Sequence, residues 1–99
     1  MASGFVGVLT VELHFPEAHS LKEKRHFVRS AKDNLRNRVG ATVAEVDHHD
    51  VWQRARLTLA CVAREAREAE RLLDDAERWL RGQEWEVGAT DRLLVDPDE

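Results

Sequence analysis

The sequence has little of several residue types that mark specialised classes of protein. Its 99 residues include a single cysteine, Cys61, which excludes an internal disulfide framework. No apolar run approaches the roughly 18 residues that a membrane-spanning helix needs. Residues 1–4 lack the basic segment and the apolar run of a signal peptide. We therefore expect a cytoplasmic protein that does not contact a membrane.

The residue patterns of familiar catalytic and phosphate-binding sites are also missing. Gly4 and Gly7 stand at the entrance of a predicted strand, not in a strand-to-helix turn that could hold a phosphate. Cys61 lies at the inward parity of another predicted strand, which is typical of a buried, unreactive thiol. Ser20 is explained by a helix cap. We expect no catalytic residues, no cofactor and no small-molecule substrate.

The composition that remains is that of one globular domain over residues 1–99. Apolar residues make up 42% of the chain and charged residues 34%, as in ordinary soluble domains. The net charge of −4 hides an uneven distribution. Residues 1–38 carry seven basic and four acidic side chains, whereas residues 39–99 carry eight basic and fifteen acidic ones. A functional face for an anion is therefore expected in the first part of the chain.

Hydrophobic periodicity predicts four strands and two helices. The strands are expected at residues 5–14, 41–47, 52–62 and 84–95, and the helices from the cap at Ser20 to Gly40 and over 64–81. Ser20 and Glu23 form a capping-box pattern. Asp74–Arg78 and Glu77–Arg81 are expected as helical ion pairs. A break in alternation over 92–95 suggests a β-bulge there.

The order strand, helix, strand, strand, helix, strand predicts an α+β fold. Right-handed crossovers turn this order into a ferredoxin-like sandwich, in which two helices cover one face of a four-stranded antiparallel sheet. The other face of the sheet is open. By parity it carries polar and aromatic side chains that suit a contact surface better than a core: Glu12, His14, Trp52, Arg54 and Arg56. We expect partner contacts or a homodimer there, with Trp52 able to stack on a base or a partner side chain.

The first helix carries the strongest candidate for a binding site. At 100° per residue, five cations fall within about 80° of one another and form one ridge: Lys22, Arg25, Arg29, Lys32 and Arg36. Lys24 lies beside them and is added as a sixth candidate. Such a ridge can follow phosphates and release their counterions. A solvated helix face and a docking face for an acidic protein segment are the alternatives.

A cluster of imidazoles and carboxylates occupies the predicted link between the second and third strands. Asp47, His48, His49 and Asp50 are all groups that bind divalent metals. Adjacent residues on a strand point apart, however, and aspartate is common in hairpin turns. We therefore expect no metal site, and a ligand-binding or catalytic role of this hairpin is the least favoured alternative.

Two segments of the chain are similar to the hallmarks of one family. The stretch FPEAHSLKEKR at residues 15–25 resembles the LPEAHSLKEKR motif of the YlxP-like family, and VAEVDHHDVWQRA at 43–55 resembles its second hallmark. The opening GVLTVEL at 7–13 is also similar. Phe15 stands where leucine is usual, and His49 where glutamine is common.

The resemblance implies a ferredoxin-like bacterial domain of unknown function, without catalytic residues to transfer. Members are often encoded among genes for translation initiation, ribosome maturation and RNA modification. We therefore predict a non-catalytic protein that associates with RNA or the ribosome through the first helix. A module for protein interaction or dimerisation is the main alternative. The low isoelectric point of about 5.7 weighs against a general RNA binder, and aromatic pairs of the RRM type are absent from the central strands.

Overall fold

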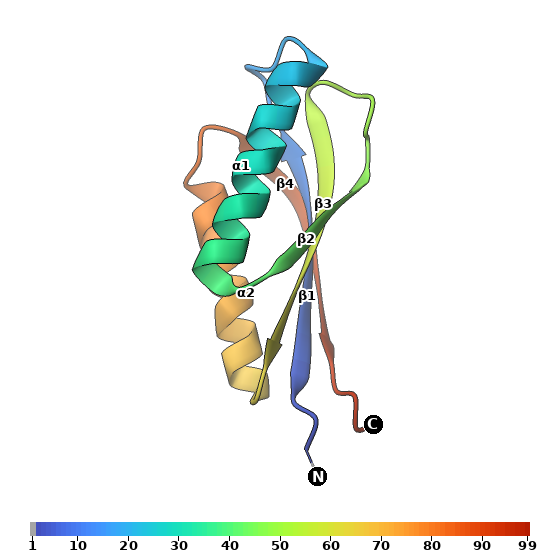
Figure 1. Ribbon diagram of the computed structural model, residues 1–99, viewed down its shortest axis with the longest axis vertical. Coiled ribbons are helices and arrows are strands. Elements are labelled where there is room, and N and C mark those ends of the chain that lie inside the picture. The colour runs from blue at the N-terminus through green and yellow to red at the C-terminus, as the bar shows by residue number, and fades with distance from the viewer. Residues whose placement is uncertain (1) are drawn as a thin grey trace.

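The computed structural model describes residues 2–99, which form four strands and two helices in the predicted order (Figure 1). The elements are β1 (Phe5–His14), α1 (Leu21–Val39), β2 (Thr42–Asp47), β3 (Arg54–Ala63), α2 (Ala66–Arg81) and β4 (Glu86–Val95). The predicted starts of β2, β3, α2 and β4 were one or two residues too early. No helix in this part of the chain combines the length and the apolar character needed to cross a membrane.

The sheet is antiparallel throughout and has the strand order β2-β3-β1-β4. Both helices lie on the same side of it, and the two termini lie at one end of the elongated molecule (Figure 1). This arrangement confirms the predicted ferredoxin-like α+β fold. One face of the sheet is left without a covering layer.

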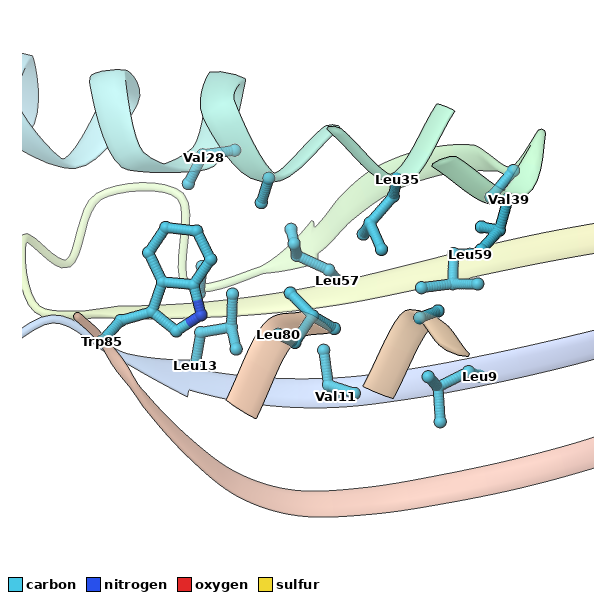
Figure 2. Packing of buried hydrophobic residues seen from close by; sticks show 14 of the residues in the cluster. Leu9, Val11, Leu13, Val28, Leu35, Val39, Leu57, Leu59, Leu80 and Trp85 are labelled. Carbon is cyan, nitrogen blue, oxygen red and sulfur yellow. The ribbon is translucent and has the colours of Figure 1, made fainter. Parts of the chain in front are cut away.

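The core forms between the helices and the covered face of the sheet. On β1, Leu9, Val11 and Leu13 are all buried, as their alternation predicts. Figure 2 shows leucines of β3 and valines of α1 closing on the same space. At one end, Phe15 stacks on Phe27 with ring centroids 5.4 Å apart. Burial of these side chains supplies the main driving force for folding.

Helix α1 begins and ends as its sequence predicts, with one difference. The Ser20 hydroxyl accepts a hydrogen bond from the Glu23 amide, and Gly40 closes the helix with φ of 67°, where glycine is favoured. The Glu23 carboxylate accepts from the amide of His19, one residue before the expected Ser20 amide. Both bonds satisfy amides that a helix end leaves free.

The predicted bulge and one predicted ion pair are wrong. The irregularity between β1 and β4 lies opposite Glu12, where β4 carries an extra residue between Val87 and Thr90. Residues 92–95 instead pair regularly with β1. Arg92 faces α2 and binds Asp74 at 2.8 Å and Glu77 at 3.2 Å, so a polar residue at this inward position is what breaks the alternation. Asp74 therefore does not pair with Arg78, which binds Asp75.

The predicted Glu77–Arg81 pair is confirmed, at 3.0 Å, and it adds to the contacts between α2 and β4. Partial burial of Glu77 opposes ionisation, but its hydrogen bonds from Arg81 and Arg92 outweigh that effect and lower the pKa of the carboxyl group. A lowered folded-state pKa contributes stability above the unfolded pKa, and this contribution is lost as the pH falls through the folded value.

We expect Glu77→Gln to reduce the free energy of unfolding at pH 7 by no more than about 1 kcal/mol, because the pairs are partly exposed. The difference from the parent protein should shrink as the pH falls from about 5 toward 3. Urea unfolding at several pH values measures this. A difference that stays constant across that range would show that the carboxylate charge is not responsible.

Cys61 is 2% exposed and faces the core from β3, which confirms its predicted burial. Desolvation raises the pKa of its thiol. We expect a thiol reagent at pH 8 to modify the native protein far more slowly than the urea-unfolded protein, since the reactive species is the thiolate. Cys61→Ser should lower stability by about 1–3 kcal/mol through a buried hydroxyl. Rapid labelling of the native protein would contradict both expectations.

Candidate nucleic-acid interface

The five predicted ridge residues line up along one side of α1. Lys22, Arg25, Arg29 and Arg36 are exposed, and Lys32 is half-buried. Arg36 pairs with Asp33 on the same helix. Among residues 2–99, none of the other four cations has a carboxylate within ion-pair distance. Four positive charges are therefore available to an external anion.

The ridge borders a groove between α1 and the edge strand β2. One part of the groove, of about 280 Å³, has Arg25, Arg29, Lys32 and Arg36 on the helix side, and Glu45 and His49 on the other. A second hollow, of about 400 Å³, continues past Lys32 and Arg36 to residues 40–43. The opposite flank of α1 faces α2, where Arg38 lies over the ring of Trp79. Lys22, Arg25 and Arg29 also line a hollow of about 710 Å³ together with His26 and Phe27, so the unpaired cations border open surface on both sides of the ridge.

Lys24 does not belong to this surface, and its assignment as a nucleic-acid contact is corrected. Its side chain is 2% exposed because its position on α1 repeats with Val28, Ala31 and Leu35 on the buried side of the helix. Its ammonium group lies 2.9 Å from a carboxylate oxygen of Glu45. A buried lysine paired in this way cannot reach a phosphate.

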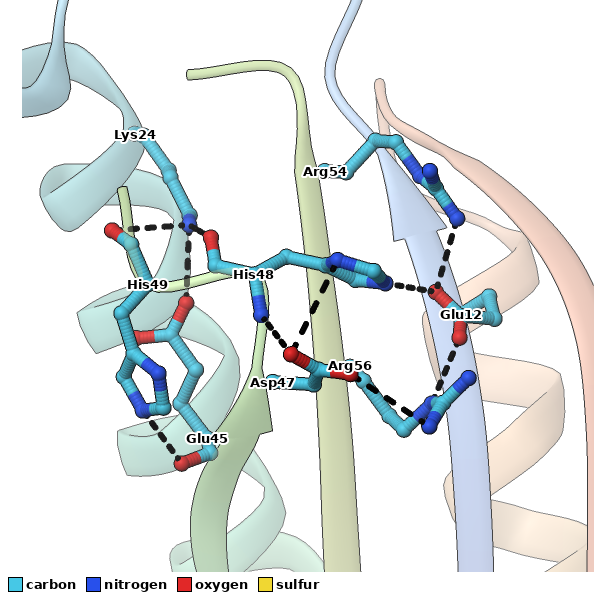
Figure 3. A network of polar contacts seen from close by, with 8 residues as sticks. All are labelled: Glu12, Lys24, Glu45, Asp47, His48, His49, Arg54 and Arg56. Atoms are coloured by element: carbon cyan, nitrogen blue, oxygen red, sulfur yellow. Dashed lines mark hydrogen bonds and ion pairs between the residues drawn. The ribbon is translucent and has the colours of Figure 1, made fainter. Parts of the chain in front are cut away.

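Lys24 instead fixes the connection between β2 and β3. The ammonium group donates hydrogen bonds to the backbone carbonyls of His48 and His49 (Figure 3). His48 has φ of 66°, an unusual backbone conformation outside glycine, and the lysine bond holds the carbonyl at this turn. Lys24 therefore links helix α1 to the β2–β3 connection, so the two motifs singled out from the sequence meet there.

The imidazoles of the connection point in different directions. His48 Nε2 lies 3.4 Å from the Glu12 carboxylate, whereas His49 Nε2 lies 3.0 Å from the Glu45 carbonyl oxygen (Figure 3). The Asp47 carboxylate accepts a hydrogen bond from the His48 amide, and this bond is the main cause that lowers the pKa of Asp47. The side chains of this cluster are thus divided between the groove and the open sheet face.

The open sheet face carries four of the five side chains predicted there. Glu12 accepts a bond from Arg56 at 2.6 Å and lies 3.8 Å from Arg54, and His14 is 3.5 Å from Glu86 of β4. Glu12 therefore neutralises much of the positive charge of β3.

Trp52 is the exception, because it precedes β3 and lies in the β2–β3 connection. Its side chain is 51% exposed. The next residue, Gln53, donates to the carbonyls of Pro16 and Ala18, just before α1. Trp52 thus stands near the N-terminal end of the basic helix rather than on the sheet.

The residue that sequence reasoning missed is Glu45. It occupies a position on β2 that faces the helices, opposite Leu57 of β3, and its side chain is only 17% exposed. The signal was present in the pattern, since Lys24 and Glu45 are both charged residues at inward positions of their elements. Opposite charges at two such positions indicate a buried pair.

We expect Lys24→Met to lower the free energy of unfolding by about 2–4 kcal/mol, because Glu45 and two carbonyls lose their buried partner. The double variant Lys24→Met/Glu45→Met should recover part of this loss, since replacing both members of a buried pair costs less than removing one. Chemical unfolding of the three proteins measures the coupling. Additive losses would indicate that the two side chains stabilise the fold independently.

Comparison with known proteins places the chain in a family. No curated protein matches the chain. One solved structure, a de novo designed protein called Ferredog-Diesel, is similar with 12% sequence identity, a TM-score of 0.44, and coverage of 92% of this chain and 88% of the designed one. A family model described as a protein of unknown function, DUF503, matches residues 6–92, which include all of β1 except Phe5 and the whole of α1, the β2–β3 connection and α2. The chain therefore belongs to the DUF503 family.

Proposed function

We propose that this protein is a non-catalytic RNA- or ribosome-associated protein that binds phosphates through the basic ridge of α1. The observation that carries the proposal is a set of four cations along one side of α1 that have no carboxylate of residues 2–99 within ion-pair distance: Lys22, Arg25, Arg29 and Lys32. With Arg36 they extend over about 21 Å of helix, at 1.5 Å per residue. A row of this length can contact several phosphates of one strand.

The chemistry of the ridge favours the RNA backbone over the bases. Phe27 stacks on Phe15 with one face, and it lines, with the exposed His26, a hollow beside Lys22, Arg25 and Arg29. Lysine and arginine side chains in a row contact phosphates by charge and spacing, and phosphate contacts do not read sequence. Structured RNA, whose strands present phosphates in a fixed arrangement, is therefore the preferred ligand. Trp52, near the start of α1, offers a single exposed ring for an unpaired base.

The rest of the molecule would orient the complex. The chain has a net charge of −4, and five acidic residues lie on α2 between Glu68 and Glu77. A negative surface away from the ridge repels RNA, so binding requires one orientation and is of modest affinity. The resemblance of residues 15–25 and 43–55 to the YlxP-like family supports the same positions, since its members are often encoded beside translation and RNA-modification genes.

Charge reversal on the ridge tests the proposal. We expect the parent protein to bind a fluorescent RNA hairpin, with affinity falling about a hundredfold between about 50 and 200 mM KCl if four phosphates are contacted. Arg25→Glu/Arg29→Glu should weaken binding at least about tenfold and flatten the salt dependence by somewhat under two units. Fluorescence anisotropy measures both quantities, and circular dichroism checks the fold.

The matched control is Arg67→Glu/Arg71→Glu on α2. These two arginines are also exposed and four residues apart, so the control produces the same change in net charge at another place. It should retain near-parental binding. Equal weakening by both variants would show that only net charge matters, and no binding by the parent protein at low salt would reject the ridge as an RNA site.

A further inference from the structure

On the open face of the sheet, apolar side chains gather at one end and polar side chains at the other. Residues paired across β3, β1 and β4 point to the same side of a sheet, so the register groups them into rows. The first two rows are apolar: Val62, Val6 and Val95, followed by Ala60, Val8 and Leu93. Val62 is 72% exposed and Leu93 59% exposed. These side chains form an uncovered apolar patch centred on β1.

The next rows are polar, and their charges are divided between the two outer strands. Thr10 lies between Thr58 of β3 and Asp91 of β4, and His14 lies between Arg54 of β3 and Glu86 of β4. On this face β3 therefore contributes the arginines and β4 the acids. Among residues 2–99, Asp91 has no ion-pair partner, and Arg54 has only the 3.8 Å contact to Glu12.

The two apolar rows and the Arg54–Glu86 row are self-complementary about an axis that runs along β1. Glu12 lies on that axis, so it meets its own copy while it keeps Arg56 of its own chain as its partner. We propose that two copies of the chain pack their open sheet faces together about such a two-fold axis. Each row of β3 in one copy then faces the same row of β4 in the other, because a two-fold axis exchanges the two sides. Val62 meets Val95, Ala60 meets Leu93, Thr58 meets Asp91, and Arg54 meets Glu86.

The size and geometry of the face suit this arrangement. Three strands about 4.8 Å apart, over five rows about 6.8 Å apart, present about 500 Å² per copy. Two copies bury about 1,000 Å² in total, where specific interfaces begin. Aligned sheets of this kind cross at about 30°, so contact is closest along the axis, where Val6, Val8, Thr10, Glu12 and His14 lie. The helices and the basic ridge stay on the outside, so this dimer does not depend on RNA binding.

Oligomeric state provides the first test. At about 100 µM we expect sedimentation equilibrium to report twice the 11.4 kDa chain mass, with a dissociation constant in the micromolar range. Val62→Glu should weaken dimerisation at least about tenfold, because it buries a charge in the apolar rows. Val51→Glu is the matched control, since Val51 is 43% exposed but lies in the β2–β3 connection, and it should dimerise like the parent protein.

A charge-exchange experiment tests the axis itself. Arg54→Glu alone places two carboxylates together at each symmetric contact, and Glu86→Arg alone places two guanidinium groups together, so each variant should dimerise about tenfold more weakly. An equimolar mixture restores opposite charges at both contacts, and a heterodimer of near-parental affinity should form. A monomeric parent protein, insensitivity to Val62→Glu, or a mixture no stronger than its components would each overturn the proposal.

Discussion

The structure depends on the position of β1 as a central strand that is covered on one side only. It pairs along its whole length with β3 and along most of it with β4, so its two faces belong to different environments. Leu9, Val11 and Leu13 lie beneath the helices without exposure above 1%. Because a shift of one residue would exchange the two faces, the burial of these side chains fixes the register of both neighbouring strands.

The same constraint decides where polar chemistry can be placed. Both helices are needed to cover the apolar face, so α1 presents its ridge of cations on the side turned away from the core. Arg38 packs over Trp79 of α2, and Phe27 of α1 packs in an aromatic cluster with Phe15 and Trp85, which lie outside the helices. The ridge beside the α1–β2 groove is thus the part of the helix that the core does not use. The uncovered sheet face is the corresponding surface on the other side of the molecule.

Lys24 connects these two surfaces through the β2–β3 connection. Its ammonium group holds the carbonyls of His48 and His49, while the His48 ring points toward Glu12 on the open face. A buried charge is costly unless it is paired and hydrogen-bonded, and Lys24 has both kinds of partner. This explains why the basic helix motif and the hairpin motif occur together: the side chain of one determines the conformation of the other.

The sequence by itself determined the order of elements, the faces of β1 and β3, the caps of α1 and the ridge of Lys22, Arg25, Arg29, Lys32 and Arg36. These features follow from periods of 2 and 3.6 residues and from local hydrogen bonds, which neighbouring residues encode. Only the tertiary structure decided the partners of Lys24 and Arg92, the place of the β4 irregularity, the position of Trp52 outside β3 and the division of charge across the open face. Each of these depends on which residues of distant segments meet across the sheet or between layers, and strand register sets that pairing once the core has packed.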